Sequence, residues 1–213
     1  EWNSMKGVLI IGGEAPSLET VRHEIVNAEI IICADSGFDI ALDMGLAPDI
    51  IIGDMDSIRN KTRLNELSEN KVLRYSEYKD ETDTELGIKY LRDNSFDEII
   101  IVGGGGGRMD HFLGIVFLFD REFPPDIWYT HDTRFQKISG YNIIPSRKGD
   151  LVSFYPAGKS VCRMKSTGLK WPLDNLLWSK GDIGISNIVT EDPFTITMLE
   201  GRLIMINQIK DTE

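Results

Sequence analysis

Short apolar segments recur along the first half of the chain, each long enough for a β-strand and too short for a helix. Longer segments between them space their apolar residues as one face of a helix does. Strands that alternate with helices in this way predict a mostly parallel, doubly wound sheet with helices on both faces. The expected strands are Val8–Ile11, Glu29–Cys33, Asp49–Ile52, Val72–Tyr75 and Glu98–Val102.

Capping residues indicate where the helices of this α/β domain begin. Ser17 is a candidate N-cap for a helix over residues 17–27. Thr82 and Glu85 have the spacing of a capping box at the start of a helix over residues 82–94. Three further helices are expected over residues 37–44, 60–70 and 109–120.

The pattern changes near Phe123-Pro124-Pro125, and no helical period follows. Short β-rich runs alternate there with turn signals such as Ser139-Gly140, a pattern that predicts a smaller all-β sandwich. We therefore assign residues 5–130 to the α/β domain and residues 131–213 to the β domain, with residues 1–4 outside the fold. The expected β runs are 128–130, 137–139, 151–155, 195–199 and 203–206.

Charge and cysteine content restrict the partners and the compartment. The 213 residues include 34 Asp and Glu against 23 Lys and Arg, a formal net charge of −11. A duplex nucleic-acid binder needs a basic face, so no nucleic-acid partner is expected. No apolar run approaches the ~20 residues that span a bilayer, so no membrane partner is expected. Cys33 and Cys162 have neither metal-binding nor disulfide spacing, which favours a reducing cytoplasm.

Aspartates follow several of the expected strands directly. Because the carboxyl ends of parallel strands lie along one edge of a sheet, these side chains are expected to gather there. Their mutual repulsion would be relieved by a hard divalent cation such as Mg²⁺, carrying substrate phosphates. The residues concerned are Asp35, Asp54, Asp56, Asp80, Asp83 and Asp110.

Two acidic segments have both a catalytic and a purely structural interpretation. Asp54 and Asp56 stand two positions apart after a strand, so both carboxylates can reach one cation, although a capped turn would use the same residues. In the second segment, Lys79 could neutralise a phosphate and Asp83 could complete a metal shell. The capping-box spacing of Thr82 favours a simple helix start equally well.

Five consecutive glycines, Gly103 to Gly107, stand between a strand and a helix and are followed by Arg108. Such a loop lets backbone N–H groups approach an anion, and Arg108 can bind a phosphate with two hydrogen bonds. No Gly-Lys-[Ser/Thr] follows, so the loop is not a Walker A motif. In the β domain, Trp171 is a candidate platform for a heterocycle, with Ser186 and Asn187 as hydrogen-bonding partners, or simply as core and turn residues.

Taken in order, six segments that span nearly the whole chain resemble the signature segments of the thiamine pyrophosphokinase family. The segments are Ala34–Gly37, Pro48–Ser57, Lys79–Asp83, Gly106–His111, Gly168–Trp171 and Ile185–Asn187. The resemblance implies a Rossmann-like nucleotide domain and a β-sandwich that binds thiamine, in a homodimer. It implies an enzyme that transfers the terminal diphosphate of ATP to the hydroxyethyl group of thiamine, giving thiamine diphosphate and AMP, with Mg²⁺ as cofactor.

The resemblance also implies roles for single residues. The catalytic acids would be Asp54, Asp56, Asp83 and Asp110, of which the first three would hold Mg²⁺. Either Asp56 or Asp110 would accept the proton of the hydroxyl group. The nucleotide would meet Asp35, Gly37, Lys79, Thr82, Gly105, Gly106, Gly107 and Arg108. Thiamine would meet Trp171, Ser186 and Asn187.

Two residues depart from the family pattern. Ser36 stands where a second glycine is usual, and Asp39 stands in place of an asparagine. Asp39 would repel a polyphosphate unless it turns away or meets a metal. Two alternative functions stay open: a diphosphokinase for another heterocyclic alcohol, such as a hydroxymethylpterin, and a non-catalytic nucleotide-sensing domain.

Overall fold

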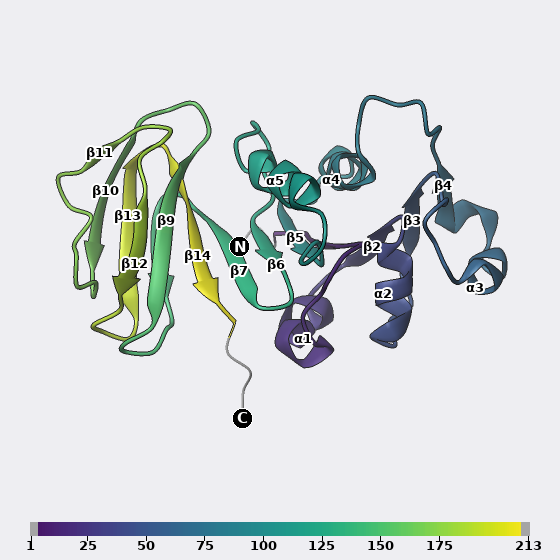
Figure 1. Cartoon of the computed structure of the whole chain (residues 1–213), viewed down its shortest axis with the longest axis horizontal. Coiled ribbons are helices and arrows are strands. Elements are labelled where there is room, and N and C mark those ends of the chain that lie inside the picture. Colours follow the sequence, from purple (N-terminus) through teal and green to yellow (C-terminus); the bar gives the residue numbers. More distant parts are fainter. Residues whose placement is uncertain (1–3, 210–213) are drawn as a thin grey trace. The chain divides into compact units, whose positions relative to one another are not determined.

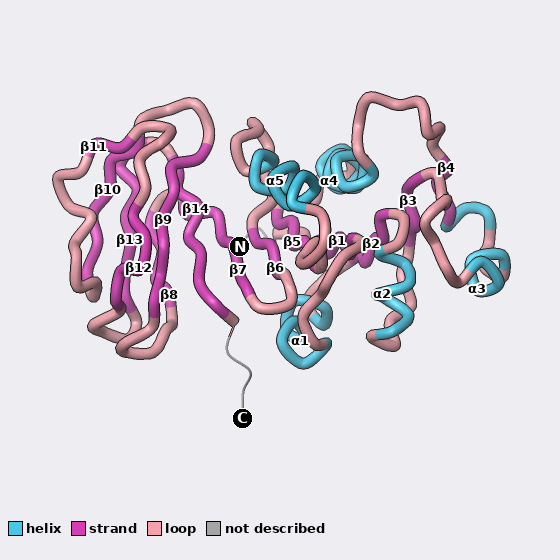
Figure 2. Tube along the Cα trace, viewed as in Figure 1, coloured by secondary structure: helices cyan, strands magenta, loops and turns pink. Residues whose placement is uncertain are grey.

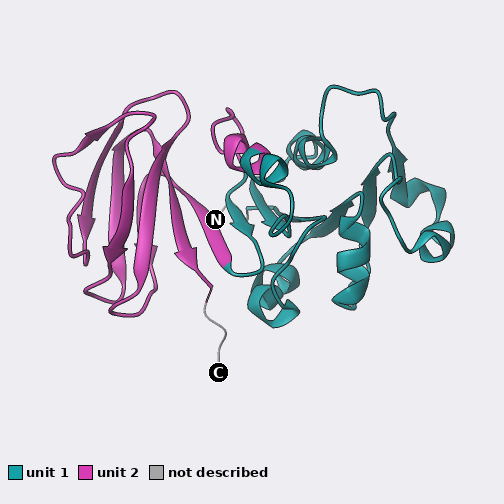
Figure 3. Ribbon diagram, viewed as in Figure 1, with its two compact units in different colours: residues 1–113, 125–132, 211–213 teal, residues 114–124, 133–210 magenta. Residues whose placement is uncertain are grey.

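The computed structural model describes residues 4–209 of the chain. Within them, contacts separate two compact units (Figure 3). The first unit holds residues up to 113 together with 125–132, and the second holds 114–124 and the residues from 133 onward.

Six parallel strands form the sheet of the first unit, in the order β6-β5-β1-β2-β3-β4. The chain proceeds outward from β1 to β4 and then returns to β5, on the other side of β1. This reversal between β1 and β5 is the feature of a doubly wound sheet, and it confirms the predicted class. The strands are β1 (Lys6–Ile11), β2 (Ile30–Ala34), β3 (Ile50–Gly53), β4 (Val72–Arg74), β5 (Glu98–Val102) and β6 (Ile127–Tyr129).

Helices cover both faces of this sheet. Figure 1 shows α1 and α2 on one face and α4 on the other. Among the described residues, no helix combines the length and apolar character needed to cross a membrane. The helical elements are α1 (Leu18–Val26), α2 (Gly37–Asp43), α3 (Lys61–Asn65), the 3₁₀ turn η1 (Glu69–Lys71), α4 (Asp83–Asp93) and α5 (Met109–Leu118).

Capping chemistry sets two helix starts where the sequence predicted them. The Ser17 hydroxyl accepts a hydrogen bond from the Thr20 N–H at 3.3 Å. Thr82 and Glu85 form a reciprocal capping box at the start of α4. The expected helix over 60–70 is wrong in length, because α3 ends at Asn65. Leu64 is its one buried residue, too little apolar surface to stabilise a longer helix.

Two antiparallel sheets form the β-sandwich of the second unit, with strand orders β12-β9-β14-β7 and β11-β10-β13-β8 (Figure 2). Both sheets contribute to its core, in which Phe154, Phe194 and Leu203 are fully buried. The strands are β7 (Thr133–Ile138), β8 (Tyr141–Ile144), β9 (Leu151–Ala157), β10 (Cys162–Thr167), β11 (Leu177–Trp178), β12 (Gly184–Ile188), β13 (Phe194–Glu200) and β14 (Arg202–Gln208).

We predict that Gly37→Ala destabilises the protein. A Cβ at Gly37 would overlap the backbone of Ile10 and Ile11, so α2 would have to move away from β1. The free energy of unfolding in urea should fall by about 1–3 kcal/mol, as in other overpacked cores. In the matched control Gly114→Ala, on α5, the new methyl group meets no atom within 4 Å. This variant should be neutral or stabilised by about 0.5–1 kcal/mol. Equal stability of both variants would contradict the close packing of α2.

Candidate active site

Three carboxylates converge where β2 and β3 end. Asp35 follows β2, and Asp54 and Asp56 follow β3. The two strands pair in parallel with Ala34 opposite Ile52, so their carboxyl ends lie side by side. One oxygen from each of the three carboxylates lies within 4.8 Å of the others. The structure thus brings together three of the acids that the sequence predicted at this edge.

Unusual backbone conformations shape this acidic cluster, defined as Asp35, Asp54 and Asp56. Asp35 and Met55 have positive φ angles of 44° and 67°. Met55 is only 2% exposed, so its side chain anchors the segment while the acids on either side stay accessible. A Cβ at Gly53 would lie 3.1 Å from Asp83 Oδ1 and 3.3 Å from the Asp35 Cβ. A glycine at this position therefore lets Asp35 and Asp83 approach each other.

The electrostatics of the acidic cluster suit a cation. Burial raises the pKa of Asp35, and the nearby charges of Asp83 and Asp56 raise it further, against a hydrogen bond from the Ser36 backbone. The Oδ1 atom of Asp35 is buried and has no hydrogen-bond partner among the described residues. The Ser57 hydroxyl donates to Asp56 Oδ1 at 2.7 Å and lowers the pKa of Asp56. An unpartnered buried oxygen among like charges is the environment that a hard divalent ion relieves.

Asp83 borders the acidic cluster but is paired with a lysine. Lys79 Nζ lies 2.9 Å from Asp83 Oδ1. Burial opposes the charge of Lys79, yet its hydrogen bond to Asp83 and the charges of Asp83, Asp54 and Asp35 raise the pKa of Lys79. Lys79 thus supplies positive charge at the edge where the sequence predicted it. Thr82 caps α4 with its hydroxyl group, and the side chain of Asp80 is exposed.

The glycine loop, residues 103–107 between β5 and α5, has two distinct halves. The N–H groups of Gly103, Gly104 and Gly105 donate to the carbonyl oxygens of Tyr129, Gly12 and Glu14, respectively, at 2.9–3.0 Å. These three N–H groups are therefore committed to neighbouring backbone. Gly106 and Gly107 are exposed and have positive φ angles of 66° and 65°.

A salt bridge follows the glycine loop at the start of α5. Arg108 Nη2 lies 2.5 Å from Asp110 Oδ2, and both side chains are exposed. Hydrogen bonds from Arg108 lower the pKa of Asp110 to about 2. Asp110 is thus paired with Arg108 and does not join the acidic cluster.

Asp39, the departure from the family pattern, has a structural partner set. Its carboxylate accepts hydrogen bonds from the backbone N–H groups of Arg59 and Asn60 at 2.8 and 3.0 Å, and from Asn60 Nδ2 at 2.6 Å. Burial acts in the opposite direction, but these hydrogen bonds hold the pKa of Asp39 below its usual value. Asp39 thus fastens α2 to the end of the segment that carries Asp54 and Asp56. The other departure, Ser36, packs its hydroxyl group against Gly12.

In the β unit, Trp171 and Asn187 form a local contact. Trp171 is 53% exposed, whereas Asn187 is 5% exposed. The Asn187 side chain hydrogen-bonds the backbone N–H and the carbonyl oxygen of Trp171. Ser186 is exposed, and its backbone N–H donates to the Ser153 hydroxyl at 3.1 Å.

Sequence reasoning missed two residues beside the glycine loop. Glu14 packs against Gly106, and a Cβ there would lie 2.5 Å from the Glu14 Cδ. His131 Nδ1 lies 3.3 Å from Glu14 Oε2. Both residues follow a strand of the sheet, which is the one signal that could have identified them.

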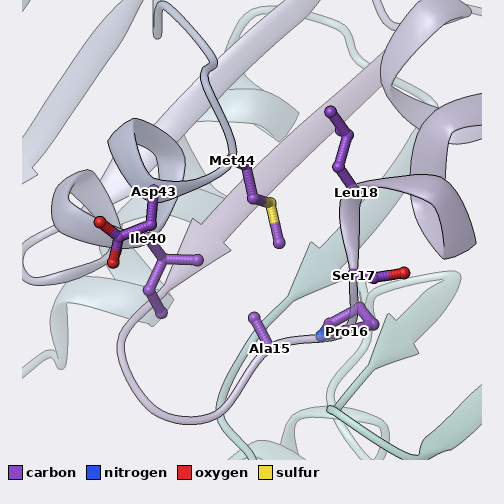
Figure 4. Close-up of a pocket in the computed structure, with 7 residues that line it drawn as sticks. All are labelled: Ala15, Pro16, Ser17, Leu18, Ile40, Asp43 and Met44. Atoms are coloured by element: carbon purple, nitrogen blue, oxygen red, sulfur yellow. The ribbon is translucent and has the colours of Figure 1, made fainter.

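A cavity of about 420 Å³ also has no sequence signal (Figure 4). It lies between the start of α1 and one side of α2, and Asp43 is the one acid that lines it. The acidic cluster does not reach it. Its lining residues are Ala15, Pro16, Ser17, Leu18, Ile40, Asp43 and Met44.

Open α/β sheets bind their ligands at the carboxyl ends of the strands. The fold and the acidic cluster therefore define a class: two-unit proteins that join a doubly wound α/β sheet with an edge site to an antiparallel β-sandwich. Two family models match the chain, "Thiamin pyrophosphokinase, catalytic domain" over residues 21–126 and "Thiamin pyrophosphokinase, vitamin B1 binding domain" over residues 140–203.

Relatives with established names agree. The chain is 31% identical to thiamine pyrophosphokinase of Bacillus subtilis over 182 residues, which cover 82% of this chain and 85% of the relative. It is 30% identical to thiamine pyrophosphokinase 1 of Oryza sativa, with 80% and 75% covered. The crystal structure of the Bacillus subtilis protein superimposes with a TM-score of 0.77 at 26% identity, covering 96% of this chain and 99% of that one. The chain belongs to the thiamine pyrophosphokinase family.

We predict that Asp39→Asn costs stability at neutral pH and less at low pH. The pKa of Asp39 is lower in the folded protein than in the unfolded chain, where it is about 3.9. The Asp39 charge therefore stabilises the fold above the unfolded pKa, and this stability is lost as the pH falls through the folded pKa. Urea unfolding should show a wild-type advantage of about 1–3 kcal/mol at pH 7 that shrinks at pH 3. The control Asp43→Asn, 71% exposed and 3.6 Å from Arg59, should change little. An equal gap at both pH values would contradict the role of the Asp39 charge.

Proposed function

We propose that this chain transfers the terminal diphosphate of ATP to the hydroxyethyl group of thiamine, giving thiamine diphosphate and AMP. The observation that carries the proposal is the acidic cluster, with its unpartnered Asp35 oxygen at the carboxyl edge of the sheet. Family membership supports thiamine as the acceptor. Within residues 4–209, no specific contact favours a hydroxymethylpterin kinase or a nucleotide sensor.

We infer that Mg²⁺ binds at the acidic cluster. Asp54 and Asp56 stay in the proposed ligand set, and the proximity of Asp35 supports adding it. The family resemblance implies Asp83 as a further ligand. Because Asp83 is paired with Lys79, we propose that it lies beside the ion in that pair. When bound, the cation supplies the positive charge that offsets the charge of the transferred diphosphate.

The proposed reaction forms one bond and breaks one bond at phosphorus. The thiamine hydroxyl oxygen attacks the β-phosphorus, the bond from that phosphorus to the oxygen bridging the α-phosphate breaks, and AMP leaves with the electron pair. The hydroxyl proton passes to a carboxylate. We assign this base role to Asp56, because it is exposed and belongs to the acidic cluster, whereas Asp110 does not.

The glycine loop and Arg108 would hold the polyphosphate. In the second half of the loop, Gly106 and Gly107 are exposed at the start of α5, where N–H groups favour anions. Arg108 can leave its exposed partner Asp110 and donate two N–H groups to phosphate oxygens instead. Gly37, Thr82 and Gly105 would then act through the shape of the site, since their contacts are with the protein itself. Asp35 would act on the nucleotide through the cation.

The remaining proposals concern the β unit and the assembly. We propose that Trp171 stacks on the rings of thiamine, with Ser186 beside it, and that the chain works as a homodimer in which residues 131–213 form the interface. We also propose a cytoplasmic location. The free, buried thiols of Cys33 and Cys162 support a reducing compartment.

We predict that Asp54→Asn abolishes thiamine-dependent AMP release from Mg·ATP while the protein stays folded. Loss of a ligand charge from the acidic cluster should reduce turnover at least about 100-fold, the scale of losing one electrostatic stabiliser. Chromatography should follow AMP and thiamine diphosphate in the same reaction, with a hydroxymethylpterin as the competing acceptor.

Asp93→Asn is the matched control, because Asp93 is an exposed acid at the end of α4, at the opposite end of that helix from Asp83. It should keep turnover within about twofold of the wild type. Near-normal turnover of Asp54→Asn would remove the acidic cluster from the mechanism. AMP release that requires a pterin and not thiamine would reassign the acceptor.

We predict that Asp35→Asn weakens divalent-cation binding without destabilising the ion-free protein. The substitution removes a charge that burial and neighbouring acids disfavour, and asparagine tolerates the left-handed backbone at this position. Thermal unfolding with and without Mn²⁺ should show a wild-type stabilisation of about 2.7 kcal/mol at 100 times the dissociation constant. Asp35→Asn should lose most of this Mn²⁺-dependent stabilisation at the same Mn²⁺ concentration. Full retention would exclude Asp35 as a ligand.

A further inference from the structure

The segment that presents Trp171 has little regular strand pairing. Gly168 to Trp171 runs antiparallel to residues 187–190, held by an isolated bridge between Leu169 and Val189. The Lys170 N–H donates to the Ile188 carbonyl at 2.9 Å, and the Thr190 N–H donates to the Gly168 carbonyl at 2.8 Å. At Trp171 this backbone pairing stops, and a side chain takes its place.

The side chain that takes over belongs to Asn187. Its Oδ1 accepts from the Trp171 N–H at 3.2 Å, and its Nδ2 donates to the Trp171 carbonyl at 2.7 Å. Oδ1 also accepts from the Ile188 N–H at 2.9 Å. A carboxamide alone among side chains of this size offers an acceptor and a donor side by side, as a neighbouring strand would. With 5% of Asn187 exposed, little of this amide is left for a ligand.

A strand irregularity aims Asn187 inward. The register of β12 against β9 shifts between Gly184 and Asn187, and Ser186 has a φ angle of 58°. The Ser186 N–H donates to the Ser153 hydroxyl, which fixes this distortion. Bulges of this kind redirect side chains and occur often beside active sites. Here the distortion leaves Ser186 exposed and Asn187 buried next to Trp171.

The side chain of Trp171 has a different environment from its backbone. The residue is 53% exposed, and Lys170 Nζ lies 4.7 Å from the ring centroid. A half-exposed indole binds a ring ligand well only if its backbone is already fixed, because ordering it on binding would cost affinity. The fixed backbone therefore holds the indole in place, and the exposed ring is left free to contact a ligand.

We propose that Asn187 is a positioning residue that acts on the ligand only through Trp171. Its carboxamide fixes the Trp171 backbone so that the indole is presented to a heteroaromatic ligand, on the face opposite Lys170. The identity of that ligand, thiamine, rests on the proposed function. Asn187 itself does not contact the ligand, in contrast to its expected role as a direct thiamine contact.

A double-mutant cycle tests this proposal. The thiamine dissociation constant is measured by calorimetry, with the KM values for thiamine and ATP, for Asn187→Ala, Trp171→Ala and the double variant. Asn187→Ala should weaken thiamine binding about tenfold and leave the KM for ATP unchanged. In the Trp171→Ala background the same change should have less than about a twofold effect. An undiminished tenfold effect in that background would show direct contact and overturn the proposal.

Two further variants keep the test decisive. Asn187→Asp keeps the volume and both acceptor contacts but sets an oxygen against the Trp171 carbonyl oxygen, so it breaks the same contact by repulsion and serves if Asn187→Ala does not fold. Asn142→Ala is the control: its Nδ2 donates to the Ser139 carbonyl in the same unit, away from Trp171, and thiamine affinity should stay within about twofold.

A fluorescence measurement separates this proposal from the proposed function. The emission of Trp171 is isolated as the difference between wild type and Trp171→Phe, without any ligand. Loss of the Asn187 amide should increase the acrylamide quenching of this emission at unchanged overall fold. Increased quenching with no thiamine binding by the wild type would retain the positioning role and reject thiamine. Unchanged quenching would reject the positioning role whatever the ligand.

Discussion

The parallel pairing of β2 with β3 is the constraint on which the candidate site depends. It sets Asp35 beside Asp54 and Asp56, and the fold must then tolerate three like charges within 4.8 Å. The cost is visible in the raised pKa of Asp35 and in its unpartnered oxygen. Two lysines lie nearby: Lys79 is already paired with Asp83, and Lys61 donates to the backbone carbonyl oxygens of Met55 and Asp56. A site with this imbalance is prepared for a cation before any substrate arrives, in the way that preorganised active sites are.

A second set of hydrogen bonds fixes the backbone on both sides of the acidic segment. Asp39 ties α2 to the backbone at Arg59 and Asn60, just beyond the acidic segment, and the Lys61 ammonium group bonds the carbonyl oxygen of Met55 within it. The loop that carries Asp54 and Asp56 is therefore held from both α2 and α3.

The sequence predicts those features that depend on local pattern. Glu98–Val102 is the fifth strand of the α/β sheet, and the caps at Ser17 and Thr82 are present, because burial period and capping act over a few residues. β8 and β12 were not expected as strands, since their buried and exposed residues do not alternate regularly. The pairing of Asn187 with a backbone 16 residues away depends on tertiary geometry that no local period encodes. The pairing of Arg108 with Asp110 is local, but it reflects side-chain orientation rather than a period. The cluster of acids was predictable because topology alone places strand ends together.

The two halves of the glycine loop have a consequence for how the protein can change. Gly103 to Gly105 give their N–H groups to the strands and loop beside them, so a substitution there is a question of folding. Gly106 and Gly107 lie exposed, and nothing within 4 Å surrounds a side chain added at Gly107. A side chain at Gly107 would have to adopt the left-handed φ of 65°, so substitution there strains the loop locally and leaves the packing of the sheet unchanged. The run of five glycines thus divides into two parts. Gly103 to Gly105 maintain the fold, whereas changes at Gly107 affect the exposed part of the loop and not the sheet.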